Sequence, residues 1–129
     1  PKLTELVVGD NCLQFVKELK LVAFGLLESV SFGSKCFTKT LSGCFEVSGC
    51  GALKSVKMGE GCCVKWSLFT LKNCDSIQEV SIGDGCFVHC ENTVFESLSA
   101  LTKLTVGNEA FRGNEKSVLV MKSEYFERE

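Results

Sequence analysis

The stretch SIGDGCF, from Ser81 to Phe87, has four related stretches elsewhere in the chain. They are VVGDNCL (7–13), SFGSKCF (31–37), KMGEGCC (57–63) and TVGNEAF (105–111). Their shared glycines, which are Gly9, Gly33, Gly59, Gly83 and Gly107, are 24, 26, 24 and 24 residues apart. A fixed period of this length predicts a solenoid, in which each period forms one turn and buries its apolar face against its neighbours.

Three columns of large apolar residues accompany the repeated glycine. The columns lie six, three and one residues before it. They are Leu3, Leu27, Leu53, Ile77 and Leu101; Leu6, Val30, Val56, Val80 and Leu104; and Val8, Phe32, Met58, Ile82 and Val106. The last two columns are two residues apart, so their side chains leave the same face of an extended strand. Each unit therefore contributes a short strand to a parallel sheet.

A second strand is predicted later in each unit. Its inward pairs are Leu19/Leu21, Phe45/Val47, Phe69/Leu71 and Thr93/Phe95, and a further inward column follows at Phe24, Cys50, Cys74 and Leu98. The two extra residues of the second unit fall within 38–44, where a surface loop can absorb them. In the fifth unit we expect the second strand near 118–121, followed by a charged tail.

The fold expected from these patterns is a β-rich, α/β-type solenoid with little or no helix. Its five units cover about 3–26, 27–52, 53–76, 77–100 and 101–129, so that residues 1–129 form a single domain. We expect right-handed turns, as is general for parallel crossovers. The chain opens on Pro1 and shows no obvious caps, which suggests either a segment of a longer chain or end-to-end self-association.

The period and the motif resemble those of leucine-rich repeat proteins. The pattern Leu-x-x-Val-x-Ile-Gly, together with NCDSIQEVSIG (73–83) and VGNEAF (106–111), is similar to the BspA-like branch, in which IGxxAF recurs. This chain departs from that branch where glycine replaces the usual proline after the strand and cysteine replaces alanine in four units. The resemblance implies a ladder of parallel strands that serves as a recognition surface.

Composition excludes several classes of partner. A net charge of −2 gives no basic patch for nucleic acid, and no apolar run approaches the length of a membrane span. The nine cysteines are an odd number, and no Asn-x-Ser/Thr site for glycosylation is present. Both features favour an intracellular, cytoplasmic location over secretion.

Four cysteines three residues after the repeated glycine form a predicted structural ladder: Cys12, Cys36, Cys62 and Cys86. The fifth unit has Ala110 at this position, so a small buried side chain fits there. The expected spacing of about 4.8 Å does not by itself forbid disulfides. We nevertheless expect these residues to be stacked, buried and unbonded.

Other kinds of chemistry fit the sequence less well than this structural interpretation. Zinc binding through Cys62-Cys63 or through CFVHC (86–90) lacks a second ligand pair, and Cys90 beside His89 faces the wrong way for a catalytic pair. The sequences GEGC and GDGC lack the Lys-Ser/Thr of a phosphate loop, so the repeated glycine is expected to turn the chain with a positive φ. The acidic residues Asp10, Glu60 and Asp84, beside Ser34 and Asn108, are expected to form a solvated rim.

The outward side of the first strand of each unit is the candidate binding face. It comprises Glu5, Val7, Ser29, Ser31, Ser55, Lys57, Glu79, Ser81, Lys103 and Thr105. We expect a non-catalytic protein-recognition or scaffold module with a protein partner, and no catalytic residue, metal or cofactor. The alternatives are an assembly spacer that associates through its ends and a cysteine-based metal or redox module. The redox states of Cys44, Cys63 and Cys90 stay open.

Overall fold

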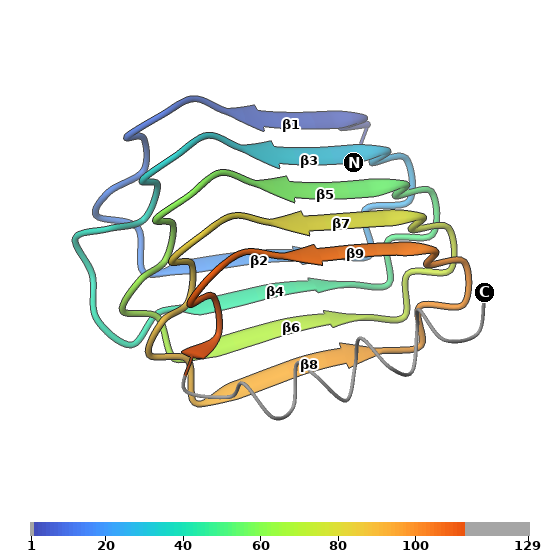
Figure 1. Cartoon of the computed structure of the whole chain (residues 1–129). Helices are drawn as coiled ribbons and strands as arrows, with labels where there is room; N and C mark the ends of the chain where they lie inside the picture. The colour runs from blue at the N-terminus through green and yellow to red at the C-terminus, as the bar shows by residue number, and fades with distance from the viewer. Residues whose placement is uncertain (1, 113–129) are drawn as a thin grey trace.

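The computed structural model describes residues 2–112 and forms a β-solenoid of two parallel sheets (Figure 1). One sheet contains β1 (Glu5–Val8), β3 (Ser29–Phe32), β5 (Ser55–Met58), β7 (Glu79–Ile82) and β9 (Lys103–Val106). The other contains β2 (Glu18–Val22), β4 (Cys44–Ser48), β6 (Leu68–Lys72) and β8 (Asn92–Glu96). The strands alternate between the sheets, so chain order runs along the solenoid axis. No α-helix occurs within residues 2–112.

The predicted register is confirmed in both sheets. Val30 is paired with Val56, and Phe45 with Phe69, so equivalent residues of successive turns lie side by side. The inward position three before the repeated glycine is fully buried in the second, third and fourth turns. The expected fifth second strand near 118–121 lies outside the described residues.

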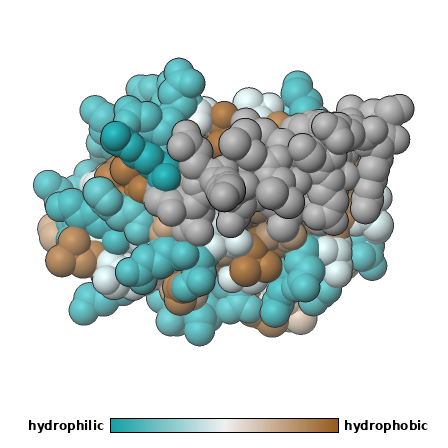
Figure 2. Space-filling model, turned by 60° about the horizontal axis from the view of Figure 1, so that its bottom comes forward, coloured by the Kyte–Doolittle hydropathy of each residue, from teal (hydrophilic) through white to brown (hydrophobic). Residues whose placement is uncertain are grey.

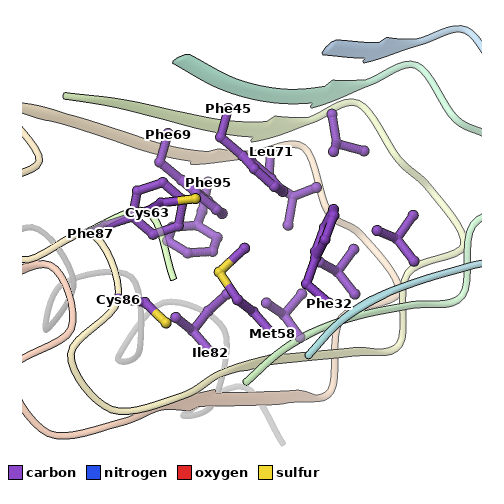
Figure 3. Close-up of a cluster of buried hydrophobic side chains, with 14 of the residues drawn as sticks. Phe32, Phe45, Met58, Cys63, Phe69, Leu71, Ile82, Cys86, Phe87 and Phe95 are labelled. Atoms are coloured by element: carbon purple, nitrogen blue, oxygen red, sulfur yellow. The ribbon is translucent and has the colours of Figure 1, made fainter. Parts of the chain in front are cut away.

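The core is a layer of aromatic and aliphatic side chains between the two sheets. Phe45, Phe69 and Phe95 project from the four-stranded sheet toward Phe32, Met58 and Ile82 of the five-stranded sheet (Figure 3). Stacking within columns is close: the Phe45 and Phe69 rings lie 5.1 Å apart and nearly parallel, and the Phe87 and Phe111 rings lie 5.2 Å apart. Repetition along the axis thus converts one sequence motif into continuous stacks of rings.

The repeated glycine has a steric role, and the prediction of a positive φ at this residue is wrong. The positive φ occurs two residues later, at Asn11, Lys35, Gly61, Gly85 and Glu109. At Gly83 an added Cβ would lie 2.7 Å from the Glu60 nitrogen and 2.7 Å from the Gly59 carbonyl carbon. From the second turn on, at Gly33, Gly59, Gly83 and Gly107, glycine is required because successive turns approach each other too closely for a side chain, whereas an added Cβ at Gly9 would meet only the Cys12 sulfur at 3.9 Å.

The single tryptophan lies in the corner before β6 and is completely buried. Its indole Nε1 donates a hydrogen bond to the Thr40 hydroxyl (2.9 Å), which in turn donates to the Val16 carbonyl (2.9 Å). Gly43 faces the Trp66 ring at a distance that leaves no room for a Cβ. The two extra residues of the second unit, 41 and 42, bulge outward at this corner, and Leu41 is 71% exposed.

Candidate functional site

The ten residues of the candidate binding face all lie on the outer side of the five-stranded sheet. They alternate with the buried positions of each strand, and the register places Glu5, Ser29, Ser55, Glu79 and Lys103 in one row and Val7, Ser31, Lys57, Ser81 and Thr105 in the next. Within each row, successive positions are about 4.8 Å apart, because this is the distance between adjacent strands. The face is therefore a regular array of hydroxyl and charged groups.

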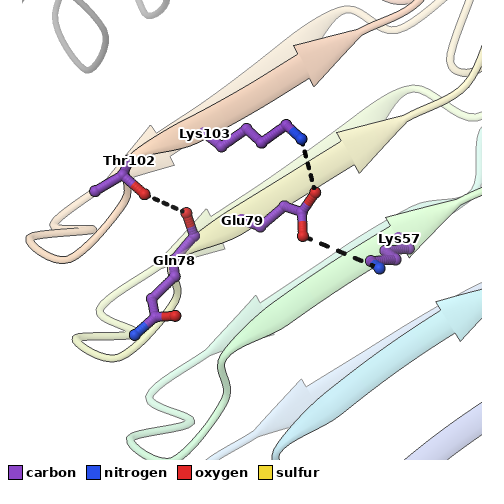
Figure 4. Close-up of polar contacts among 5 residues, drawn as sticks. All are labelled: Lys57, Gln78, Glu79, Thr102 and Lys103. Atoms are coloured by element: carbon purple, nitrogen blue, oxygen red, sulfur yellow. Dashed lines mark hydrogen bonds and ion pairs between the residues drawn. The ribbon is translucent and has the colours of Figure 1, made fainter. Parts of the chain in front are cut away.

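Glu79 lies at the centre of the charged part of this face. Its carboxylate is 3.7 Å from the Lys103 Nζ on one side and 4.0 Å from the Lys57 Nζ on the other (Figure 4). Beside it, the Thr102 hydroxyl donates to the Gln78 carbonyl (3.2 Å). Exposed ion pairs of this kind contribute about 0.2–1 kcal/mol each, so they orient the side chains more than they stabilise the fold.

Three of the four cysteines of the predicted ladder are linked by hydrogen bonds. The thiols of Cys36, Cys62 and Cys86 donate to the glycine carbonyl of the preceding turn, at 3.2, 3.0 and 3.0 Å. The sulfurs of Cys62 and Cys86 also accept from the backbone N–H of the preceding cysteine, both at 3.4 Å. Each buried thiol thus satisfies a backbone group that the turn leaves unpaired.

The prediction that all four ladder cysteines are buried is wrong for Cys12. It is exposed, because the described residues contain no turn before it to cover its sulfur. Its thiol donates to the Asp10 carbonyl of its own turn instead, at 3.4 Å. The ladder therefore begins at Cys36.

The other cysteines also occupy structural positions. All nine lie within the described residues and none forms a disulfide. Cys50, Cys63, Cys74 and Cys90 are buried, and Cys44 is half-buried on the outer side of β4. Burial raises the pKa of Cys63 well above its usual range and the pKa of Cys74 to about 11. The pKa of Cys62 is raised first by its interaction with the Cys86 thiol and second by burial. These thiols carry little thiolate at neutral pH, which lowers their reactivity.

The residues considered for catalysis or metal binding do not come together in the structure. His89 is exposed whereas Cys90 is buried, and no cluster of three or more His, Cys, Asp or Glu side chains within residues 2–112 could hold a metal. In the acidic rim, Asp10 and Asp84 each accept a backbone N–H of the next turn, from Ser34 and Asn108, both at 2.8 Å. Asp10 and Asp84 thus each cap the turn that follows.

Apolar side chains are exposed mainly on the first turn, which the sequence patterns above did not single out. Of the eight exposed large hydrophobic residues within 2–112, six lie between residues 3 and 26. The signal was available in the alignment of the units, because Phe15 stands where later units have Lys39, Lys65 and His89. On the face shown in Figure 2, in contrast, the visible hydrophobic surface is divided into small patches between hydrophilic side chains.

Within the described residues, no helix is long and apolar enough to cross a membrane. Comparison of the chain with family models, with curated proteins and with solved structures finds no match. The function must therefore be argued from the geometry of the solenoid.

Proposed function

We propose that this chain is a non-catalytic module of the leucine-rich repeat type, similar to the BspA-like branch, that recognises or scaffolds a protein partner. The family proposal is supported by the motif ending in VGNEAF (106–111) and by turns about 24 residues apart. The functional proposal is supported by one observation above all. The outer face of the five-stranded sheet carries two rows of side chains that are not used in the core.

The proposed mode of binding depends on the rigidity of these rows. Strand pairing fixes the spacing of the side chains, so a partner binds an array that is already organised and loses little entropy in ordering it. Lys57, Glu79 and Lys103 provide the charges that select the partner, since charged groups at an interface contribute mainly specificity and association rate. We place the module in a reducing compartment, because none of its nine cysteines is in a disulfide.

The structural observations favour this function over a metal or redox module. Three thiols of the ladder are hydrogen-bonded to glycine carbonyls inside the solenoid. A metal ligand must be a thiolate, and a redox-sensing thiol must be accessible.

A capture experiment with matched charge variants tests the proposed binding face. The chain is immobilised as wild type, as Lys57→Glu/Lys103→Glu on the binding face, and as Lys39→Glu/Lys65→Glu at an exposed corner away from it. Proteins bound from an extract of the source cells are identified by mass spectrometry. We expect a partner that binds the wild type and the corner variant and is lost from the face variant. A partner that both variants retain, or that both lose equally, would contradict the proposed face.

A further inference from the structure

The chain contains a single Asp-Gly sequence, Asp84–Gly85, and it lies in the turn after β7. Asp84 is exposed, and Gly85 has a φ of 68°. In an Asp-Gly sequence the backbone nitrogen that follows the aspartate readily attacks its carboxyl carbon, because glycine has no Cβ to hinder the approach. None of the asparagines of the chain precedes a glycine. Asp84 is therefore the residue with the greatest intrinsic tendency to rearrange in this way.

The turn that follows binds both of the groups that would react. The backbone N–H of Asn108 donates to Oδ1 of Asp84 (2.8 Å), and the carbonyl of Asn108 accepts the N–H of Gly85 (2.9 Å). We call this pair of hydrogen bonds the Asn108 clamp. For the rearrangement, the Gly85 nitrogen must lose its proton and the Asp84 carboxyl group must turn toward that nitrogen. The clamp opposes both steps, since each hydrogen bond holds one of the two groups on Asn108.

The same pair of hydrogen bonds occurs in the first turn, at a sequence that reacts less readily. The N–H of Ser34 donates to Oδ1 of Asp10 (2.8 Å), and the carbonyl of Ser34 accepts the N–H of Asn11 (2.9 Å). Here the side chain of Asn11 hinders the attack on Asp10. In the third turn Glu60 stands at the position of Asp84, and its longer side chain would have to close a larger, less favourable ring. A reactive sequence and a clamp thus coincide at Asp84.

We propose that Asp84–Gly85 is a latent site of self-modification, which the Asn108 clamp protects and which reacts when the fourth and fifth turns separate. The Gly85 nitrogen then bonds to Cγ of Asp84, and the amide proton leaves with the carboxyl hydroxyl as water. The product is a cyclic imide. Water adds to either carbonyl of the imide and yields aspartate again or isoaspartate, in which the main chain runs through Cβ and Cγ. The site does not depend on the proposed binding face.

Isoaspartate at this position keeps the turns from closing again. The main chain becomes longer by a methylene group, and the Asp84 carbonyl, which accepts the N–H of Gly61 (2.8 Å), becomes a free carboxylate. Two residues later, the Cys86 thiol donates to the Gly59 carbonyl at 3.0 Å, so the lengthened main chain also displaces the ladder. A temporary opening of the solenoid is thus converted into a lasting one.

The test is the rate at which isoaspartate forms at position 84 during prolonged warm incubation near neutral pH, measured on peptides by electron-transfer mass spectrometry. The folded 129-residue chain is compared with the same chain unfolded in guanidinium chloride. We expect the folded chain to react at least about tenfold more slowly, because only its small opened fraction can react. Asp84→Glu, which introduces the residue of the third turn, should form none. Equal rates in the folded and unfolded wild type would overturn the proposal.

The variant Asn108→Pro tests the clamp itself. Asn108 is the second residue of a turn closed by the hydrogen bond from the Ala110 N–H to the Gly107 carbonyl (3.3 Å), a position that proline favours. The substitution removes the N–H that binds Asp84. We therefore expect the variant, with folding checked by circular dichroism, to form isoaspartate several-fold faster than the folded wild type. Asn108→Ala is the matched control, because it keeps both backbone hydrogen bonds and should react at the wild-type rate.

A second variant opens the clamp without removing a hydrogen bond, and it decides the question if Asn108→Pro does not fold. Val106, in β9, is partly buried against the core, so Val106→Ala weakens the packing of the fifth turn beside the clamp. We expect faster formation of isoaspartate at position 84 in this variant as well. A folded Asn108→Pro or Val106→Ala chain that reacts as slowly as the wild type would overturn the proposal.

Discussion

Replacing Gly83 with alanine tests the close approach of successive turns at the end of each strand. The new Cβ would lie 2.7 Å from the Glu60 nitrogen, 2.7 Å from the Gly59 carbonyl carbon and 2.8 Å from the Gly59 oxygen. All three atoms belong to the backbone and cannot rotate away. Gly9 is the matched control, because the nearest atom to its Cβ would be the Cys12 sulfur at 3.9 Å, which is ordinary contact.

The magnitude follows from the opposing effects of the added methyl group. Overpacking in a well-packed interior costs about 1–3 kcal/mol. The upper half of this range applies at Gly83, because relieving the overlap would stretch the hydrogen bonds from Gly83 to the Met58 carbonyl (2.9 Å) and from Gly61 to the Asp84 carbonyl (2.8 Å), which join the same two turns. Alanine also restricts the unfolded chain, which stabilises by about 0.4–1 kcal/mol. We expect Gly83→Ala to lose about 2 kcal/mol and Gly9→Ala to lose nothing or gain about 0.5 kcal/mol.

Urea unfolding followed by tryptophan fluorescence measures both variants, since the single, fully buried Trp66 reports on the core. The unfolding midpoint of Gly83→Ala should fall with an unchanged slope, and its Tm should drop by about 10 °C. The reasoning is refuted if both alanine variants lose the same free energy, or if Gly83→Ala is as stable as the wild type.

Three further predictions concern the cysteines and the buried tryptophan. Cys62→Ala should lower the free energy of unfolding by about 1–2 kcal/mol, because it removes a hydrogen-bond donor and an acceptor inside the ladder. Cys12→Ala, which removes an exposed thiol, should change it by less than about 0.5 kcal/mol. Equal losses in urea unfolding would show that the thiol hydrogen bonds do not contribute. Titration with a thiol-specific disulfide reagent should find rapid reaction at Cys12, slower reaction at Cys44, and the remaining seven thiols only after denaturation; native reaction of more than two thiols would disprove the buried arrangement. Thr40→Val should cost about 1–3 kcal/mol, because it leaves the buried Trp66 N–H without an acceptor, and a thermal unfolding curve that matches the wild type would contradict this.

The strands could be predicted from the sequence because their side chains repeat along the solenoid axis. Each inward residue, such as Val56, contacts its equivalents in the turns before and after, so the same apolar requirement recurs at every period. Glu79 and its lysine neighbours were placed on one outer face for the same reason, since alternation along a strand determines the side on which a residue lies.

Three features could not be predicted in this way, because they depend on what lies next to a turn rather than on the turn itself. Cys12 has the same position in the motif as Cys86 but lacks the glycine carbonyl of a preceding turn among the described residues, so its position in the array determines its exposure. The left-handed residue was expected at the repeated glycine, but the requirement there is space, and residues as different as Lys35 and Gly85 adopt the positive φ instead. The burial of Trp66 depends on a gap left by Gly43 in the previous turn, which no pattern within one unit contains.

The bulge at residues 41 and 42 has a consequence for engineering this chain. The second turn accommodates two additional residues there while β4 keeps its pairing with both β2 and β6. Loop length at such a corner costs little, since each doubling adds only about 0.6 kcal/mol of closure entropy. A peptide epitope or a fluorophore attachment sequence grafted between Leu41 and Ser42 would therefore project from the side of the solenoid, leaving the stacked interior and both sheets intact.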